Sequence, residues 1–393
     1  MRRIYIAILY FFIMILPGYS ISYLGLNSMS DLVNFYGVRS LGMGNTGIAA
    51  SEDYSAIMVN PAALYTLDGI YSGMDMRIVY NSEHIMDFES PVVYDSSFNK
   101  FKFSSLYVAG KAMDYISFGA GLFPVIDFNY YSSHSIPETS AEKYGVKTID
   151  SSGSLDAYAL ALSINIPDIG ALGFSLDILR GSKKLDESIV YNDNQYGTSS
   201  KSVSEYDYSG IKFNIGAYYS VNRMLAFGAK IDFGYDLKEK EDNVENIYTL
   251  PMSMGIGFVY RNFIRYDTQI TMDIIYSKWG DYKVKYGDAA EFTPAGYHNI
   301  VSYRIGVEHL VGKSKRDSIP VRLGYYYQPF AGDNAYSISA VTAGVGFPFR
   351  PVMINLSMDY GKRSYRGNNV FFSADKLVDE TLINIVFNID YKF

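Results

Sequence analysis

Apolar and polar residues alternate with a period of two along much of the chain, as in β-strands that present one apolar face. The final segment, 383–393, shows this most clearly, with Asn384, Asn388 and Asp390 among the positions between its apolar residues. The same alternation recurs near 225–236, 266–276, 321–328 and 352–360. Several stretches run about 10 to 13 residues, which is long for a globular sheet and suits a tilted crossing of a bilayer.

The alternation predicts about fourteen strands, an even number as in single-chain bacterial barrels. We expect them to begin near residues 69, 101, 115, 155, 170, 208, 223, 252, 266, 300, 317, 336, 350 and 380. Long polar connections are expected near 82–100, 127–154, 182–207, 237–251, 279–299 and 364–379, and short ones between them. Short turns at one end and long loops at the other are typical of outer-membrane barrels. The sequence therefore predicts an all-β fold, an antiparallel transmembrane β-barrel with both chain ends on the periplasmic side.

The first 22 residues have the pattern of a secretory signal peptide. Arg2 and Arg3 precede an apolar run over 4–16, and a small residue, Ser22, fits a cleavage site. That run is shorter than the roughly 20 residues that a membrane-spanning helix needs. We expect cleavage after Ser22, and no later apolar run is long enough for such a helix.

Composition supports a membrane wall. The chain has 393 residues, with 38 Tyr and 24 Phe against a single Trp. Outer-membrane barrels use aromatic residues at both membrane interfaces. There is no cysteine, which excludes disulfides, thiol chemistry and a lipidated N-terminal cysteine. Loss of Arg2 and Arg3 takes the formal net charge from -7 to -9, which argues against nucleic acid as a partner.

The segment from Gly37 to Leu64 is rich in small residues and has neither a helical nor a strand period. It contains a literal G-x-G-x-x-G pattern at Gly42, Gly44 and Gly47, which in a strand–turn–helix unit would bind a dinucleotide. The sequence that follows reads as antiparallel strands instead. We therefore interpret these glycines as part of a tightly packed coil inside the barrel.

Candidate chemistry is sparse. The histidines, His84, His134, His298 and His309, have no metal-ligand spacing, so we expect no metal, no cofactor and no enzyme activity. The alternation places charges of both signs toward the lumen. We interpret them as ion pairs that brace the wall, with an ion or substrate path as the alternative: Lys230, Asp232, Asp273, Arg304, Glu308, Arg322 and Asp359.

Three blocks of the chain together resemble the FadL-type outer-membrane transporters of hydrophobic compounds, a group that includes PorV-like barrels. The first runs from Arg39-Ser40-Leu41-Gly42-Met43-Gly44 through Glu52-Asp53-Tyr54-Ser55-Ala56 to Asn60-Pro61-Ala62-Ala63-Leu64. The others are Asp273-x-x-Tyr276-x-x-Trp279 and the pair Tyr303–His309 with Val321–Tyr325. The resemblance implies a hatch over 23–67 that closes a barrel over 68–393, with its key residues at Arg39, Gly42, Gly44, Asn60, Pro61 and Ala62.

The resemblance also implies passive uptake of long-chain fatty acids or other hydrophobic molecules across the outer membrane of a diderm bacterium. Ligand would leave sideways through a gap in the third strand, where Gly119, Gly121 and Pro124 weaken the ladder; an ordinary bulge is the alternative. Outer-membrane lipid would surround the wall, and the barrel-assembly machinery would read the last strand, which ends at Phe393.

The chain departs from the fatty-acid transporters because it is short for that group and its outer loops are polar. Some relatives of similar length serve in protein-secretion or surface-attachment systems, and such a binding role is the main alternative function. An open porin is a third possibility, against which the hatch segment argues.

Overall fold

The computed structural model describes Met29 and residues 36–87, 93–136, 144–262, 267–312, 318–331, 337–366 and 376–393. The proposed signal peptide lies outside the described residues. The strands are β1 (Ile70–Asp87), β2 (Val93–Met113), β3 (Ile116–Asp127), β4 (Tyr130–Ile136), β5 (Gly145–Ile166), β6 (Gly170–Tyr191), β7 (Ser200–Ser220), β8 (Leu225–Asp232), β9 (Tyr235–Glu241), β10 (Val244–Leu250), β11 (Ser253–Asn262), β12 (Thr268–Ser277), β13 (Lys283–Tyr286), β14 (Ile300–Val311), β15 (Ile319–Gln328), β16 (Ile338–Phe349), β17 (Val352–Arg366) and β18 (Lys376–Lys392).

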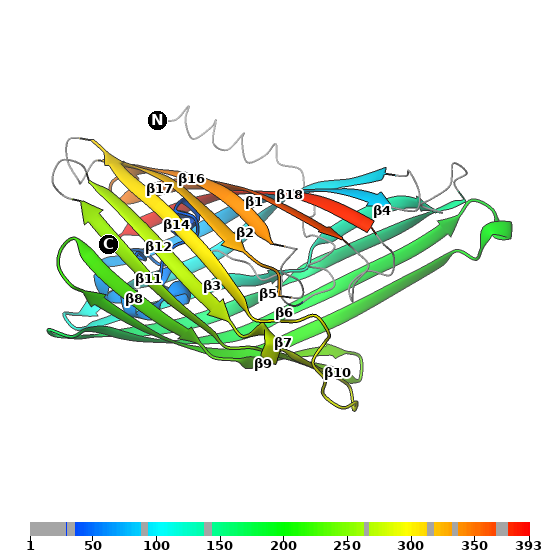
Figure 1. Ribbon diagram of the computed structural model, residues 1–393, viewed down its shortest axis with the longest axis horizontal. Helices are drawn as coiled ribbons and strands as arrows, with labels where there is room; N and C mark the ends of the chain where they lie inside the picture. The colour runs from blue at the N-terminus through cyan, green and yellow to red at the C-terminus, as the bar shows by residue number, and fades with distance from the viewer. Residues whose placement is uncertain are drawn as a thin grey trace.

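These segments form one antiparallel sheet that closes on itself, because β1 pairs with both β2 and β18 (Figure 1). Four strands of the barrel are each made of two consecutive segments: β3 with β4, β8 with β9, β10 with β11, and β12 with β13. The closed barrel therefore has 14 strands. Each expected strand matches one of them, so the predicted all-β transmembrane barrel is confirmed.

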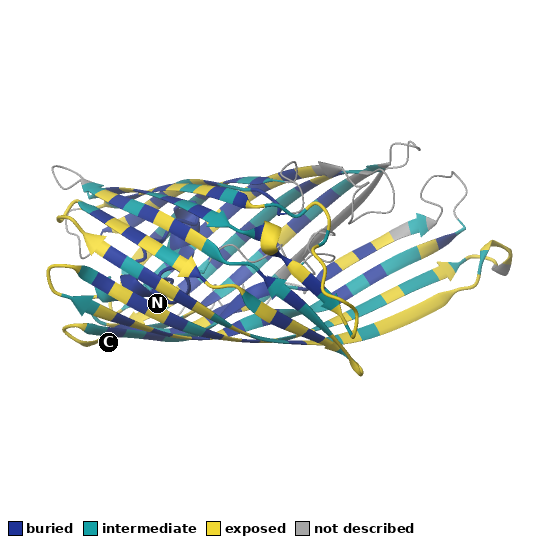
Figure 2. Ribbon diagram, turned by 60° about the horizontal axis from the view of Figure 1, so that its bottom comes forward, coloured by how far each residue is buried: buried dark blue, intermediate teal, exposed yellow. Residues whose placement is uncertain are grey.

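The expected division into apolar and polar faces is also confirmed. On β15 the outward Leu323 is 62% exposed and the inward Arg322 is 3% exposed. On β18 the inward Asn388 is fully buried, whereas Tyr391 on the other face is exposed. Figure 2 shows this alternation as a chequered wall of buried and exposed residues. An apolar outer surface and a polar lining are what a barrel needs when lipid surrounds it.

The long connections differ from the expectation. Much of 82–100, 127–154, 182–207 and 237–251 is strand, because β1, β2, β5, β6, β7, β9 and β10 extend through those ranges. β5 and β6 have 22 residues each, or about 70 Å of strand, whereas β15 has 10. The wall is therefore much taller on one side, and paired strands project beyond the rest (Figure 1).

Residues 36–67, called the N-terminal segment below, contain the short helices α3 (Val38–Gly42), α4 (Ala56–Val59) and η1 (Pro61–Thr66). The segment lies inside the barrel near the end that carries the short turns (Figure 1). α3 packs on β15, β16 and β17, and η1 packs on β5, β6 and β7, so the segment contacts opposite walls. Among the described residues, no helix combines the length and apolar character needed to cross a membrane.

Candidate functional site: the lumen and its N-terminal segment

Glu308 on β14 is the centre of a buried polar network. Its Oε2 accepts hydrogen bonds from Arg39 Nε at 3.0 Å and from Arg322 Nε at 2.7 Å. Its Oε1 accepts from Arg39 Nη2 and from Gln269 Nε2, each at 2.9 Å. Two guanidinium groups and one amide thus satisfy a carboxylate that is only 7% exposed. The network joins α3 to three adjacent strands, β12, β14 and β15.

Arg39 also joins two parts of the N-terminal segment. Its Nη1 donates to the carbonyl oxygen of Ala50 at 2.8 Å, and its Nη2 lies 3.2 Å from Glu52 Oε2. Glu52 in turn forms an ion pair with Arg261 on β11. Burial alone would lower the pKa of the Arg39 guanidinium, but the carboxylates of Glu308 and Glu52 outweigh it and raise that pKa. Arg39 is therefore a charged link between segment and wall.

The glycine motif lies against the wall through its backbone. Gly47 N and Ile48 N both donate to Asp273 Oδ2, at 2.7 and 3.0 Å. Gly44 has a φ of 68°, which favours glycine, and its N donates to Thr342 Oγ1 at 2.9 Å. The backbone amides of Gly47 and Ile48, at the end of the dinucleotide-like pattern, thus bind a carboxylate of the barrel wall instead of a ligand phosphate. Gly42 packs beside Arg322 and Gly344 in the same region.

Asn60, Pro61 and Ala62 form the start of η1. Asn60 Oδ1 accepts from Ala62 N at 3.2 Å and so caps this helix, with Pro61 in its first turn. Asn60 Nδ2 donates to the carbonyl oxygens of Ile48 at 2.6 Å and Ala217 at 3.1 Å. Ser163 Oγ on β5 donates to Ala62 O at 3.0 Å. The fully buried Asn60 therefore ties the helix both to its own segment and to β7.

The wall approaches the segment closely at glycines on opposite sides of the barrel. A Cβ atom at Gly216 on β7 would lie 1.9 Å from Asn60 Oδ1. One at Gly324 on β15 would lie 2.1 Å from Gly44 N. Neither position has room for a side chain, so these glycines set how closely the segment and wall approach.

A tyrosine pair anchors the segment to β1 and β2. The Tyr54 ring stacks on that of Tyr107, with centroids 3.5 Å apart and planes 4° apart. The Tyr54 hydroxyl donates to Asp75, whose two oxygens lie 2.7 and 2.6 Å away. Asn388 Nδ2 donates to the same carboxylate at 2.8 Å. Burial raises the pKa of Tyr54, which keeps this hydroxyl a donor.

The remaining lumen charges lie in separate groups. Lys230 Nζ is 2.8 Å from Asp232 Oδ2, and Lys212 lies between Asp232 and Asp177. Arg304 Nη1 donates to the carbonyl oxygen of Asn45 at 2.9 Å. Asp359 accepts from the Tyr326 hydroxyl at 2.8 Å and from Asn384 Nδ2 at 2.8 Å. Over the described ranges, no group of three or more His, Asp or Glu side chains is arranged to hold a metal ion.

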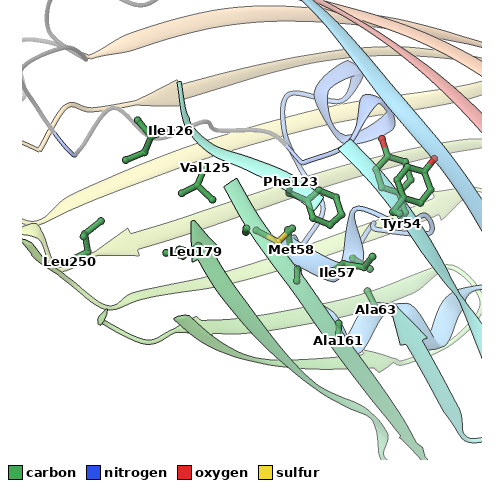
Figure 3. Close-up of a cluster of buried hydrophobic side chains, with 14 of the residues drawn as sticks. Tyr54, Ile57, Met58, Ala63, Phe123, Val125, Ile126, Ala161, Leu179 and Leu250 are labelled. Atoms are coloured by element: carbon green, nitrogen blue, oxygen red, sulfur yellow. The ribbon is translucent and has the colours of Figure 1, made fainter. Parts of the chain in front are cut away.

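A cavity of about 150 Å³ lies directly beside the N-terminal segment. Met58 and Val59 line it from α4, Val125 and Leu179 from the wall, and Trp279 from the connection after β12. Figure 3 shows Met58, Val125, Leu179 and Leu250 within one cluster of buried apolar side chains. Polar groups gather at one part of its lining: Asp177, Lys212, Lys230, Asp232 and Arg304. The lining of the cavity is thus divided about equally between apolar and polar side chains.

The pairing of the third strand, β3, is interrupted, but the interruption lies on the C-terminal side of the predicted Gly119 and Gly121. Gly119 and Gly121 pair with β2 and with β5, and a Cβ at Gly119 would lie 2.5 Å from Ile57 Cγ1. The registered pairing of β3 with β2 ends at Leu122 and Leu106. Pro124 lies two residues further on, beside a shift in register against β5. Beyond this point β2 and β3 are not joined by registered backbone pairs in the described residues.

Ion pairs bridge this unpaired stretch. Asp127, the last residue of β3, lies 2.8 Å from Lys102 Nζ on β2 and 2.8 Å from Arg77 Nη2 on β1. In this stretch, side chains rather than a hydrogen-bonded ladder therefore hold β2 and β3 together.

Sequence reasoning missed several residues of this site. Asp177 was visible in the alternation of β6, where Ser175 and Asp177 face inward and Phe174 and Ile178 outward. The roles of Gly216 and Trp279 had no such signal, because they depend on which wall residue lies opposite the N-terminal segment and the cavity.

A closed antiparallel barrel with an apolar outer wall and a filled polar lumen is a transmembrane β-barrel of the outer-membrane type. Comparison with solved structures agrees. The chain is similar to the toluene transporter TodX of Pseudomonas putida, with 18% identity and a TM-score of 0.62 over 92% of this chain and 99% of that one. A FadL homologue of Pseudomonas aeruginosa gives 14% identity and a TM-score of 0.64 over 92% and 99%.

The toluene transporter TbuX of Ralstonia pickettii gives 17% identity and a TM-score of 0.60, again over 92% of this chain and 99% of the other. No protein-family model and no curated protein matches the chain. At these identities the likeness establishes the fold, so the resemblance to FadL-type barrels is confirmed at that level. The structures concerned are transport channels rather than enzymes.

Proposed function

We propose that this protein is an outer-membrane channel through which small hydrophobic compounds enter the cell by passive diffusion. The hatch expected over residues 23–67 prevents free flow of water and ions; its described part is residues 36–67, and residues 23–35, apart from Met29, lie outside the described residues. The cavity beside this segment carries the proposal, because apolar side chains of the segment and the wall, such as Met58, Val125 and Leu179, make up about half of its lining. An oily molecule needs such a chamber, since a water-filled pore does nothing to favour it over bulk water.

The size of the cavity favours compact ligands over long acyl chains. The cavity has a volume of about 150 Å³. A cavity of that size is large enough for benzene, whereas drug-sized ligands need about 300 Å³ or more. The solved structures that the fold resembles include toluene transporters and a monoaromatic hydrocarbon channel. We therefore place single-ring compounds ahead of long-chain fatty acids as the substrate class.

The route has three parts. A ligand enters at the end of the barrel where the long strands project, rests in the cavity, and leaves sideways between β2 and β3, in the stretch that follows Leu122 on β3. The absence of registered pairing there supports the last step, and the hatch residues Arg39, Gly42, Gly44, Asn60, Pro61 and Ala62 keep the axial route closed. The alternative of a secretion or surface-attachment partner gains no support from the structural likenesses.

Export and assembly complete the proposal. Residues 1–22 would direct the chain across the inner membrane and be removed. The assembly machinery would then recognise the last strand, whose Phe393 is 73% exposed and donates its backbone N–H to Ile70 O at 2.9 Å.

Uptake of labelled toluene and labelled palmitate tests the function directly. The two compounds would be offered to cells of a diderm host that lacks its own FadL-type proteins, with and without this protein in the outer membrane. We expect faster toluene entry and little change for palmitate. Equal toluene entry in both strains, with the barrel shown to be folded, would rule the proposal out.

A further inference from the structure

We propose that the cavity beside the N-terminal segment selects single-ring compounds that carry a carboxylate, such as benzoate. The inference rests on the proposed uptake function and specifies the ligand of the same cavity. The charged side chains on the lining are the cations Lys212, Lys230 and Arg304 and the carboxylates of Asp177 and Asp232. Three positive charges against two negative ones leave one positive charge in excess, and a buried charge needs a partner of opposite sign.

The two carboxylates of the lining are already engaged by the lysines. Lys230 Nζ lies 2.8 Å from Asp232 Oδ2. Lys212 Nζ lies 3.7 Å from Asp232 Oδ1 and 3.9 Å from Asp177 Oδ2. The oxygens without a hydrogen bond, Asp177 Oδ1 and Asp232 Oδ1, are buried, so neither is open to a ligand. A ligand in the cavity therefore meets two carboxylates whose charges the two lysines offset.

Arg304 on β14 is the remaining cation. Its Nη1 donates to Asn45 O at 2.9 Å, and within the part of the chain that the structure describes Arg304 forms no ion pair. Asp273 lies directly across the β12–β14 ladder, but it does not line the cavity. The Oδ2 atom of Asp273 accepts instead from Gly47 N and Ile48 N, at 2.7 and 3.0 Å. The charge of Arg304 therefore borders the cavity without a carboxylate in contact with it.

The unused N–H groups of Arg304 suit a carboxylate ligand. A guanidinium has five N–H donors in a planar fork, and two of them can bind both oxygens of one carboxylate. Arg304 Nε and Nη2 have no hydrogen bond to the described residues and, unlike the buried Arg77 Nε, keep accessible surface. Lys212 Nζ likewise has no hydrogen bond to those residues, and its side chain is 17% exposed. On this polar part of the lining, a ligand can thus reach positively charged donors.

The apolar part of the lining and the volume of the cavity define the rest of the ligand. Met58, Val125 and Leu179 supply apolar contacts beside the charged groups. A volume of about 150 Å³ holds a single ring and excludes a long acyl chain. A ring acid therefore fits the charge and the size together, whereas a long-chain fatty acid fits only the charge.

Benzoate and benzamide isolate the charge. They have the same ring and the same number of non-hydrogen atoms, but at neutral pH benzoate is negatively charged and benzamide is neutral. Trp279 is the single tryptophan of the chain and lines the cavity, so its fluorescence reports binding of either compound to the purified protein. We expect benzoate to bind about tenfold more tightly, as one charge-assisted hydrogen bond gives. Equal affinities, or tighter binding of benzamide, would overturn the inference.

Replacement of Arg304 tests the residue on which the inference depends. R304M removes the charge, so the preference for benzoate should fall below about threefold while benzamide still binds. R304K keeps the charge and loses the planar fork, so it should retain only part of the preference. Benzamide binding shows that a variant is folded. A full preference in R304M would contradict the assignment. If R304M does not bind benzamide, R304K decides, because an undiminished preference there would exclude the paired contact.

R261M is the matched control, because Arg261 on β11 pairs with Glu52 in the lumen and lies outside the lining of the cavity. It should keep the preference for benzoate, and loss of the preference there would overturn the assignment to Arg304. Toluene separates the two levels of the proposal. If toluene and benzamide bind and benzoate is not preferred, only the inference fails; if none of the three binds, the uptake function fails as well.

Discussion

Arg39 and Glu308 lie 269 residues apart in the sequence, yet two hydrogen bonds of 3.0 and 2.9 Å join their side chains inside the barrel. Arg322 and Gln269 bind the same carboxylate. The contact therefore couples the position of the N-terminal segment to the wall, and its loss should affect both stability and the seal of the lumen.

Replacement of Glu308 by alanine should destabilise the protein strongly. It leaves Arg39 and Arg322 buried near each other without their shared carboxylate, which typically costs about 3–5 kcal/mol. Unfolding in urea, followed by the gel-mobility shift of the folded barrel, measures the change. E308A should also admit ions, seen as conductance steps in planar bilayers that the unaltered protein lacks.

The control is the exposed pair between Lys238 and Glu245 on the β9–β10 hairpin, whose atoms lie 3.0 Å apart. K238A should change the free energy of unfolding by less than about 1 kcal/mol, because solvent screens such pairs. Equal effects of K238A and E308A would show that the buried network has no special role.

Gly216 should not tolerate even alanine. The added Cβ would overlap Asn60 Oδ1 at 1.9 Å, so η1 must shift away from β7 at a cost of about 1–3 kcal/mol. Planar-bilayer recordings of G216A should show intermittent openings. G361A serves as the control, since its Cβ would come no closer than 3.0 Å to the flexible Ile338 side chain and 3.3 Å to Ala340 Cβ. If G216A unfolds with the normal free energy and its recordings show no openings, the position of the segment does not depend on this contact.

Filling the cavity should weaken ligand binding without opening the barrel. Val125 lines the cavity and is 5% exposed, so V125F places a ring where a small ligand would bind. We expect toluene affinity, followed through Trp279 fluorescence, to fall about tenfold or more. I338F adds similar bulk in a separate buried cluster with Tyr326 and Ala340, and should leave affinity unchanged. Unchanged affinity in V125F would place the ligand elsewhere.

Bridging the seam between β2 and β3 should block uptake. The chain has no cysteine, so K102C with D127C gives two unique thiols at the ion pair that spans the unpaired stretch. A short bis-maleimide linker across them should reduce toluene entry several-fold, whereas the uncrosslinked double variant should transport. The same linker across K238C and E245C, on the outer hairpin, is the control. Full uptake through a bridged seam would exclude lateral exit there.

The membrane-spanning part of the fold was predictable because lipid outside and a polar lumen inside force a strict alternation, as in Arg322 and Leu323. The sequence predicts loops for the outer extensions, because water wets both faces of the strands there and the alternation is lost. Lys183 and Lys184, or Asp186 and Glu187, are adjacent charges within β6. Strand pairing continues through them without the pattern that reveals it.

The site was predictable only in part. The inward direction of Asp273 and Glu308 followed from the alternation, as did the polar lining at Lys230 and Asp232. Their partners did not, because Arg39 and the amides of Gly47 and Ile48 come from an aperiodic segment whose path depends on tertiary contacts.

The close fit between Gly216 and Asn60 has a consequence for the order of assembly. The N-terminal segment leads directly into β1, and β1 is joined to β18, the last strand of the barrel, from Tyr71 with Lys392 to Asp87 with Lys376. A preformed cylinder would leave no clearance for a folded segment to slide past glycines on opposite walls. We therefore expect the strands to assemble around the folded segment, and β1 to pair with β18 as the final step.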